Sequence, residues 1–330
     1  MLYIYGIIVK KVLFYTHDIS YQENPKAYRI LQYFPYLERA GCKPRVMTTK
    51  ASLPALIKET MASDVVCVQR LLLNPFKLLL LRRFARKIVY DFDDAVMYGT
   101  KNESITRRMR FKMTVARADA VFCGNHFLLA EAEKYGKGNL YYVPTVVDTG
   151  TYPVKVSDNH QPFVVGWMGS SSTLRYLDDI GELFTAFRGK KGITFKFVAD
   201  RPPDLEGEGI VFEKWEKDGE KSSLLSFDMG IMPVRDDIWS RGKCGLKLIQ
   251  YMASGLPSLT HPVGVACEMI ENGVNGLLRQ DLDGWKEATT QLSTDASLRS
   301  RMGKAARACA EEKYSLKLWG PKVAEIISEL

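Results

Sequence analysis

Cations gather in one stretch of the second half of the chain, GIMPVRDDIWSRGKCGLKLIQYMASG, which spans residues 230–255. Lys243 and Lys247 are four residues apart, so we expect them on one face of the helix that this stretch predicts, with Arg241 close by. Fixed cations beside a helix start can stabilise the charge that develops on a departing diphosphate. A solvated helix face above buried apolar neighbours is the alternative interpretation.

A second candidate phosphate site is GWMGSSST, residues 166–173, where an expected strand ends and an expected helix begins. Gly169 would let a ligand approach the backbone closely, and the N–H groups at a helix start attract phosphate. Ser170, Ser171 and Thr173 supply more hydroxyl groups than a single helix cap needs, which favours phosphate binding. An ordinary cap at Ser172 or Thr173 explains part of the pattern equally well.

Three carboxylates follow an apolar strand in YDFDDAVMY, residues 90–98. Asp91 and Asp93 form a D-x-D pair, which in some transferases holds a divalent cation through oxygen ligands. We favour a different interpretation, in which one of these carboxylates orients a sugar hydroxyl or accepts its proton. Capping of a helix is the third alternative. The four histidines show no metal-ligand spacing, so no metal is expected.

Short apolar runs alternate with helical patterns through both halves of the chain, which predicts βαβ units and parallel sheets covered on both faces. The Pro-containing region 144–160 separates the halves. We therefore expect an α/β protein with two doubly wound, Rossmann-like domains. Such sheets bind ligands beyond the carboxyl ends of their strands, so two domains facing each other across a cleft would hold a substrate between them.

The net charge of +8 is distributed unevenly over the 330 residues. Residues 1–150 hold 23 Lys and Arg against 13 Asp and Glu, whereas residues 151–330 hold 23 against 25. A basic half suits a phosphate-bearing, anionic-lipid or nucleic-acid partner, or simply solvated helix faces. Six scattered cysteines and the lack of a signal-like or spanning segment indicate a cytoplasmic protein. Peripheral attachment to the inner face of a membrane through residues 71–87 is a further hypothesis.

Residues 230–278 closely resemble the nucleotide-sugar-binding segment of bacterial retaining glycosyltransferases of family 4, which have the GT-B fold. YDFDDAV, GWMGSSST and VPTVVD resemble other landmarks of the same family, in the same order. The resemblance implies an acceptor-binding domain over residues 1–150 and a nucleotide-sugar-binding domain over 151–312. The helix at 313–330 would then cross back to the first domain.

The family signature has two glutamates seven residues apart, and Lys243 and Gln250 stand at those places here, which indicates a divergent branch. The resemblance implies that Gln250 bonds a ribose hydroxyl, that Lys243 binds phosphate, and that Asp93 or Asp94 replaces a catalytic histidine. The predicted catalytic residues are Asp93, Asp94, Arg241 and Lys243. The predicted donor-binding residues are Gly169, Ser170, Ser171, Thr173, Arg201, Trp215, Lys247, Gln250, Val263 and Gly264, and the acceptor-binding residues are His17 and Arg29.

These observations predict a metal-independent, retaining glycosyltransferase. It would move a sugar from a nucleotide-diphosphate donor to a glycan, a lipid-linked acceptor or a small molecule. An epimerase or a phosphorylase of the same fold is the nearest alternative, and it would need no acceptor. A nucleic-acid-binding α/β protein is the alternative from another class, but aromatic and basic residues are not interleaved as a stacking platform needs. No nucleic-acid partner is therefore expected.

Overall fold

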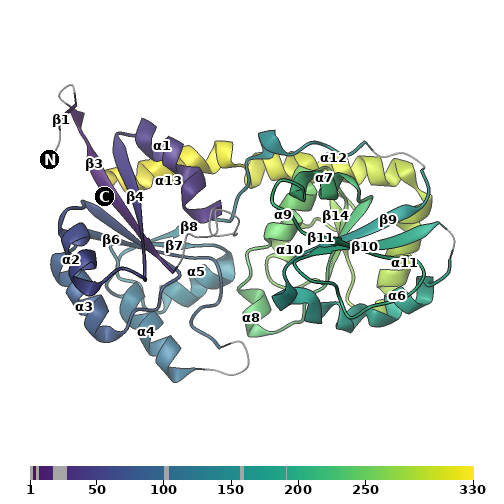
Figure 1. Cartoon of the computed structure of the whole chain (residues 1–330), viewed down its shortest axis with the longest axis horizontal. Helices are drawn as coiled ribbons and strands as arrows, with labels where there is room; N and C mark the ends of the chain where they lie inside the picture. Colours follow the sequence, from purple (N-terminus) through teal and green to yellow (C-terminus); the bar gives the residue numbers. More distant parts are fainter. Residues whose placement is uncertain (1–2, 5–6, 18–27, 100–103, 157–159, 191) are drawn as a thin grey trace. The chain divides into compact units, whose positions relative to one another are not determined.

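The computed structural model describes residues 3–4, 7–17, 28–99, 104–156, 160–190 and 192–330. The chain divides into two compact units, which are coloured along the sequence in Figure 1. Unit 1 comprises Met1–Val146, Asp237–Cys244 and Leu316–Leu330, and unit 2 comprises Val147–Asp236 and Gly245–Ser315. This division differs from an unbroken second domain over 151–312, because residues 237–244 belong to the first unit.

Unit 1 is built on a six-stranded sheet with the order β4-β3-β5-β6-β7-β8, in which all neighbours are parallel. Its strands are rich in apolar residues because a parallel sheet is buried on both faces. Two further short strands near the N-terminus pair antiparallel with each other. The strands are β1 (Tyr3–Ile4), β2 (Ile7–Ile8), β3 (Lys10–Thr16), β4 (Cys42–Thr48), β5 (Val65–Gln69), β6 (Lys87–Phe92), β7 (Ala120–Cys123) and β8 (Asn139–Tyr142).

Helices cover both faces of this sheet (Figure 1). Side chains from α2, α3, α4 and α5 share one core with Tyr90 and Phe92, and α1 and α13 share the opposite core with Phe14 and Val89. The helices of unit 1 are α1 (Phe34–Arg39, after the 3-10 turn η2, Leu31–Tyr33), α2 (Leu53–Met61), α3 (Pro75–Phe84), α4 (Ile105–Val115), α5 (His126–Glu133), α8 (Ile238–Arg241) and α13 (Leu316–Glu329).

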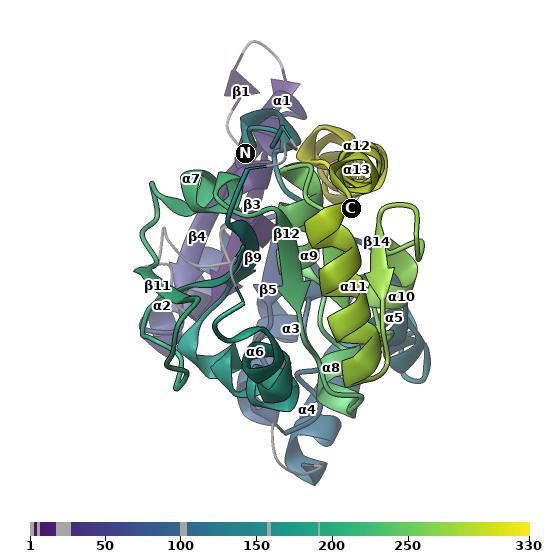
Figure 2. The same cartoon turned by 90° about the vertical axis from the view of Figure 1, so that its right-hand side faces the viewer.

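Unit 2 has a second six-stranded parallel sheet, with the order β11-β10-β9-β12-β13-β14. Figure 2 looks toward this unit and shows α6 and α11 near each other. Both helices pack on the core that contains Trp167 and Phe197, and α9 contacts α12. The strands are β9 (Phe163–Met168), β10 (Ile193–Ala199), β11 (Ile210–Lys214), β12 (Met229–Met232), β13 (Ser258–Thr260) and β14 (Gly276–Leu278).

The single helix that we predicted after Gly169 is wrong. The chain instead forms two 3-10 turns, η4 (Ser171–Tyr176) and η5 (Asp178–Ile180), before α6 (Gly181–Phe187). Ser, Asp and Gly favour such breaks because their side chains or backbone compete with regular helix bonding. The other helical segments of unit 2 are η3 (Thr149–Thr151), α7 (Glu220–Leu225), α9 (Leu246–Ala253), α10 (Ala266–Met269), α11 (Leu282–Thr294) and α12 (Ala296–Lys313).

Most helices in the described segments are short, and the 18-residue α12 carries many charged side chains. None of the helices in those segments has the length and apolar character that crossing a bilayer requires.

Candidate active site

A buried ion pair lies below the carboxyl edge of the unit 1 sheet. Arg29 Nε donates to Asp91 Oδ2 at 3.0 Å, and its Nη1 donates to the Val143 carbonyl at 2.9 Å. Arg29 and Asp91 are 3% and 7% exposed. Burial raises the pKa of Asp91, and Arg29 opposes that shift. The two side chains satisfy each other, so this geometry favours neither a D-x-D metal site nor the acceptor contact that we predicted for Arg29.

Arg70, Asp93 and Asp94 form an acidic cluster where β5 and β6 end. Arg70 Nε lies 3.3 Å from Asp93 Oδ1, and its Nη2 contacts Asp94 Oδ2. The backbone of Arg70 is left-handed, with φ 58°, and its N–H donates to the Asp91 carbonyl at 2.8 Å. A non-glycine residue is rarely held in that conformation, and such strain is often found at functional sites.

The Asp94 carboxyl group is poised to exchange a proton near neutral pH. Burial raises its pKa to about 6, with a smaller contribution from Asp93, while Arg70 and Lys243 oppose the shift. The side chains of Asp93 and Asp94 are 13% and 23% exposed. A helix-capping role is wrong for these carboxylates, because the next helix begins at Ile105 and is capped by Ser104. The cluster fits the predicted acid–base or orienting role.

Residues 237–244 are fastened to this edge of unit 1 by Asn125. The Asn125 Oδ1 caps α5, while its Nδ2 donates to the carbonyls of Arg241 at 3.1 Å and Lys243 at 2.9 Å. At Gly242, an added Cβ would lie 2.5 Å from the Ala95 Cβ, so the segment packs directly on the loop after β6. This contact explains why the segment belongs to unit 1.

The prediction that Lys243 and Lys247 share a helix face is wrong. α9 begins only at Leu246, after Gly245 has turned the backbone into the left-handed region at φ 66°. A Cβ at Gly245 would also meet Met269 Sδ at 2.9 Å, which adds a steric reason for glycine there. Lys243 therefore lies outside the helix, in unit 1, whereas Lys247 lies on α9 in unit 2.

Lys247 meets the loop that follows β9 in unit 2. Its Nζ donates to Thr173 Oγ1 at 3.1 Å and lies 4.1 Å from the centroid of the Trp167 ring. A Cβ on Gly169 would lie 2.5 Å from the same Nζ, so glycine makes room for the ammonium group. The structure thus brings together Gly169, Thr173 and Lys247 at the carboxyl end of β9.

Several amides of this loop already have partners within the protein. Gly169 N–H donates to the Val198 carbonyl at 2.9 Å, and Thr173 N–H donates to the Ser170 carbonyl at 2.9 Å. Ser171 N–H donates to Asp200 Oδ1 at 2.5 Å, and although burial opposes the effect, hydrogen bonding from Ser171 lowers the pKa of Asp200. The loop therefore does not present the free N–H groups of a helix N-terminus, and the ammonium group of Lys247 is its candidate phosphate contact.

The Tyr251 hydroxyl lies between β9 and β12, where the strand order of unit 2 reverses. It accepts from Met168 N–H at 3.1 Å and lies 3.3 Å from the Ile231 carbonyl, to which it donates. The ring lies against Gly230, where a Cβ would come within 2.4 Å of it. This reversal is where α/β sheets open a ligand crevice, and Tyr251 stabilises the separation of the two strands.

Gln250 is buried, and its Nε2 donates to Glu220 Oε1 at 2.9 Å. The same carboxylate oxygen accepts from the Tyr152 hydroxyl at 3.3 Å. We predicted that Gln250 contacts a ribose hydroxyl, but in this structure its amide group already bonds to Glu220 of α7. Sequence reasoning missed Glu220 because 30 residues separate it from its partner.

The other predicted donor-binding residues also follow strand ends of unit 2. Trp215 N–H donates to the Ala199 carbonyl at 2.8 Å, beyond β11, and Arg201 is exposed two residues after β10. Val263 and Gly264 follow β13 and His261, whose Nδ1 accepts from the Val234 N–H at 3.2 Å. Burial lowers the pKa of His261.

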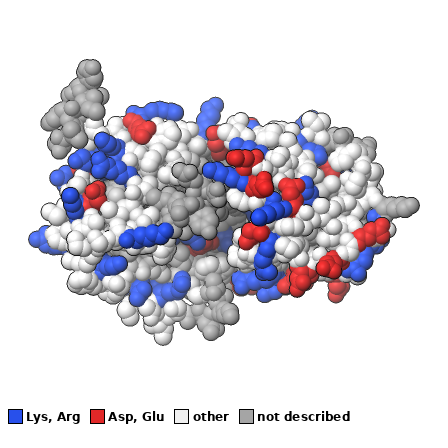
Figure 3. Space-filling view, viewed as in Figure 1, with Lys and Arg blue, Asp and Glu red and all other residues white. Residues whose placement is uncertain are grey.

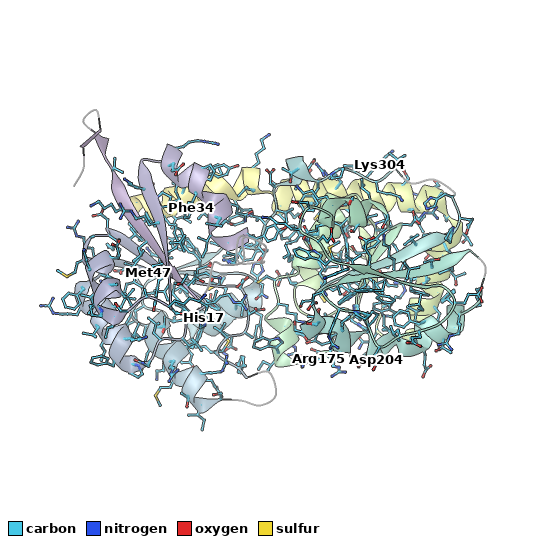
Figure 4. All side chains as sticks on the ribbon, viewed as in Figure 1. His17, Phe34, Met47, Arg175, Asp204 and Lys304 are labelled. Carbon is cyan, nitrogen blue, oxygen red and sulfur yellow. The ribbon has the colours of Figure 1, made fainter. Side chains whose placement is uncertain are left out.

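The predicted acceptor residue His17 is exposed at the end of β3, where it is labelled in Figure 4. Its carbonyl accepts from Thr49 Oγ1 at 3.0 Å, which joins the loops after β3 and β4. Within the described residues, no group of three or more His, Cys, Asp or Glu side chains could hold a metal ion. Arg70, Asn125 and Tyr251 were not among the predicted site residues. The sequence gives a signal for two of them, because Asn125 begins the helical pattern NHFLLAEAEKYG and Tyr251 follows the predicted Gln250.

Comparison with known proteins is informative for the family and the fold. Residues 164–295 match the family described as Glycosyl transferases group 1. HepE of Anabaena, solved with UDP-glucose, has a TM-score of 0.74 at 16% identity and covers 97% of this chain and 100% of its own. Sucrose-phosphate synthase of Thermosynechococcus elongatus has a TM-score of 0.78 at 14% identity, covering 97% and 98%.

The lipopolysaccharide outer core galactosyltransferase WaaB, in its apo form, has a TM-score of 0.68 at 11% identity, covering 97% and 100%. No protein with a curated description matches the sequence at a significant level. The predicted α/β class with two Rossmann-like domains is confirmed by the two parallel sheets and by these folds. The chain therefore has the GT-B fold, and its residues 164–295 are similar to the family Glycosyl transferases group 1.

Proposed function

We propose that this protein transfers a sugar from a UDP-sugar to a glycan, lipid-linked or small-molecule acceptor, with retention of the anomeric configuration. The structural similarity to HepE, whose structure contains UDP-glucose, supports UDP as the nucleotide of the donor. The donor diphosphate would lie at the carboxyl edge of the unit 2 sheet. Peripheral contact of the basic unit 1 with an anionic membrane belongs to the same proposal.

The observation that carries the proposal is the position of Lys247. Its ammonium group lies against Gly169, Thr173 and the Trp167 ring at the strand-order reversal of unit 2. A cation held there can bind the diphosphate of the donor and stabilise the charge that grows on it as the glycosyl bond breaks. Thr173 supplies a hydroxyl group beside that cation.

The acidic cluster of unit 1 supports an acceptor role for that unit. A carboxyl group with a pKa of about 6 can accept a hydrogen bond or a proton from an acceptor hydroxyl near neutral pH. Asp94 is the better candidate of the two carboxylates, because its side chain is the more exposed. Arg241 and Lys243 remain predicted catalytic residues, and Lys243 acts electrostatically on Asp94.

A titration of UDP into the full chain tests the donor site. We expect Lys247→Ala to weaken UDP binding by about 1–3 kcal/mol, because a charge-assisted hydrogen bond to phosphate is lost. Lys304→Ala, at an exposed position of α12 labelled in Figure 4, is the matched control and should bind like the wild type. Equal affinity of Lys247→Ala and wild type would contradict the proposed diphosphate position.

Product analysis separates transfer from the alternatives. With a glycan or lipid-linked acceptor, we expect release of UDP and a product whose anomeric configuration matches that of the donor, which nuclear magnetic resonance can establish. Conversion of the sugar nucleotide in the absence of acceptor would indicate an epimerase instead. Phosphate-dependent cleavage of a glycan would indicate a phosphorylase.

A further inference from the structure

Helices α2, α3 and α4 of unit 1 present an exposed face that the donor chemistry does not use. We propose that this face docks on an anionic lipid bilayer, with apolar side chains entering the interface and cations contacting the headgroups. α2 contacts α3, and α3 contacts α4, so the three helices form one continuous surface. The proposal names the membrane-binding face of the proposed function and does not depend on the identity of the donor.

Exposed apolar side chains concentrate on these helices. Among the described residues, six large apolar side chains are more than half exposed, and five of them lie on α2, α3 or α4. The five are Met61, Phe76, Leu79, Ile105 and Met109. Isolated exposed apolar residues are normal, but a group of this kind on neighbouring helices indicates a binding surface.

Cations lie among these apolar residues, and the two more basic helices contain no acidic residue. α3 has the sequence PFKLLLLRRF, and α4 has the sequence ITRRMRFKMTV. Arg82 is paired with Asp119 at 2.6 Å, whereas Arg83 lies beside the Phe84 ring. In Figure 3, the part of unit 1 that carries these helices is mainly blue and white.

The order of residues along each helix places apolar groups and cations on the same face. On α4, Ile105, Arg108, Met109 and Lys112 follow the i, i+3, i+4, i+7 pattern of a single helix face. On α3, Phe76, Leu79 and Arg83 follow i, i+3, i+7. A face of this kind suits the boundary between lipid headgroups and acyl chains, where both kinds of side chain find partners.

An open, shallow surface on α2 adds exposed apolar area. It is formed by Leu53, Pro54, Ile57, Lys58, Met61 and Ala62. Only Lys58 among them is charged. Duplex nucleic acid presents mainly its phosphates to such a surface, while an anionic bilayer offers both acyl chains and negative headgroups. Charge complementarity and apolar exposure therefore favour the same occupant.

Flotation of the full chain with vesicles tests the proposal directly. We expect binding to vesicles of phosphatidylcholine mixed with phosphatidylglycerol, weaker binding to phosphatidylcholine alone, and a decrease in binding as salt screens the charges. Two double variants should each lower the partition coefficient at least about tenfold: Phe76→Ser with Leu79→Ser, and Lys77→Glu with Arg83→Glu. All four positions lie on α3 outside the described core.

Matched controls carry the same substitutions on unit 2. Val211→Ser with Val274→Ser removes exposed apolar groups, and Arg301→Glu with Lys304→Glu reverses exposed charges on α12. Both controls should bind vesicles like the wild type. Each α3 variant should keep the thermal shift that UDP produces, which shows that the fold and the donor site persist.

Three outcomes would overturn the proposal. The first is no binding of the wild type to anionic vesicles at low salt. The second is equal loss in the α3 variants and in the unit 2 controls. The third is formation of a dimer, or of a complex with nucleic acid, that the α3 substitutions disrupt while vesicles are not bound. A failure of UDP to bind, with vesicle binding intact, would count against the donor assignment alone.

Discussion

The two sheets of this protein differ at the point where the strand order reverses. In unit 1 the reversal lies between β3 and β5, where Thr16 Oγ1 donates to Gln69 Oε1 at 2.9 Å and both side chains are buried. In unit 2 it lies between β9 and β12, where the Tyr251 hydroxyl is inserted and a glycine begins the following loop. In unit 1, two buried polar side chains bond to each other at the reversal. In unit 2, the Tyr251 hydroxyl lies between the two strands and bonds to the backbone of both.

The charges next to these reversals differ in the same way. Unit 1 pairs its carboxylates with arginines inside the fold, as in Arg29 with Asp91 and Arg70 with Asp94. Unit 2 places the ammonium group of Lys247 over an aromatic ring and beside a hydroxyl group. Unit 1 therefore has a preformed acidic cluster whose charge is largely balanced, and unit 2 has a cation suited to an anionic ligand.

Among the variants considered, removal of Arg29 in unit 1 should lower the stability of the protein most strongly. Arg29→Met leaves Asp91 buried without its counter-charge, so we expect the free energy of unfolding to fall by about 3–5 kcal/mol. Arg29→Met combined with Asp91→Leu should recover most of that loss, because a well-packed apolar pair can replace a buried ion pair. Denaturant unfolding of the three proteins measures both effects.

The exposed pair of Arg86 and Asp64 is the matched control, since the Arg86 side chain is 68% exposed. Arg86→Met should change the free energy of unfolding by less than about 1 kcal/mol. Similar losses for Arg29→Met and Arg86→Met would mean that burial of the Arg29 pair has little energetic effect.

The role of Tyr251 at the strand-order reversal of unit 2 is tested by removal of its hydroxyl group. Tyr251→Phe leaves the buried Met168 N–H and the Ile231 carbonyl without the partner they share, which should lower stability by about 1–3 kcal/mol. Because the loop after β9 follows Met168 directly, UDP affinity should fall as well. Calorimetry with UDP at a temperature where the variant is folded measures this second effect.

Tyr314→Phe provides a comparison at another buried tyrosine of unit 2. Reduced stability in both variants, with UDP affinity lowered only in Tyr251→Phe, would support a positioning role at the reversal. Unchanged UDP affinity in Tyr251→Phe would mean that Tyr251 contributes to packing and does not position the donor site.

The elements were easier to predict than the contacts at the site. The apolar run DVVCVQ became β5 because a buried parallel strand requires such a run, whatever the fold places beside it. The contacts of Asn125 with Arg241 and Lys243 join residues more than a hundred positions apart, so no local pattern reveals them. Gly245 shows that even a local feature can be missed. Its left-handed backbone separates Lys243 from the helix that holds Lys247, and a single glycine in the sequence predicts such a break only weakly.

The pH dependence of stability tests whether the pKa of Asp94 in the acidic cluster is raised. The pKa of Asp94 is raised to about 6, so between its unfolded value and that pH the folded protein holds a proton that the unfolded chain has released. The free energy of unfolding should therefore fall as pH rises from about 4 to about 6, by up to about 1 kcal/mol per pH unit. Asp94→Asn should remove this contribution.

Asp93→Asn is the matched variant for this experiment. The Asp93 charge raises the pKa of Asp94, so its removal should move the same fall to lower pH. Chemical denaturation across this pH range compares wild type and both variants, with Arg70, Lys243 and Arg29 as the other charges that act on Asp94. Identical pH profiles for wild type and Asp94→Asn would contradict the raised pKa.

The smallest expected effect concerns the tether of residues 237–244. Asn125→Asp keeps an oxygen that can cap α5 but loses the Nδ2 donor to the Arg241 and Lys243 carbonyls. We expect a stability loss of about 1 kcal/mol and faster amide exchange at residues 241–243, whose N–H groups bond within the segment. Asn74→Asp, at the cap of α3, makes the same chemical change without a tether, because Asn74 Oδ1 accepts from Lys77 N–H at 2.8 Å. If both variants left exchange in the segment unchanged, the packing of Trp239, Gly242 and Cys244 on unit 1 would suffice to hold the segment, and the Asn125 hydrogen bonds would not be needed.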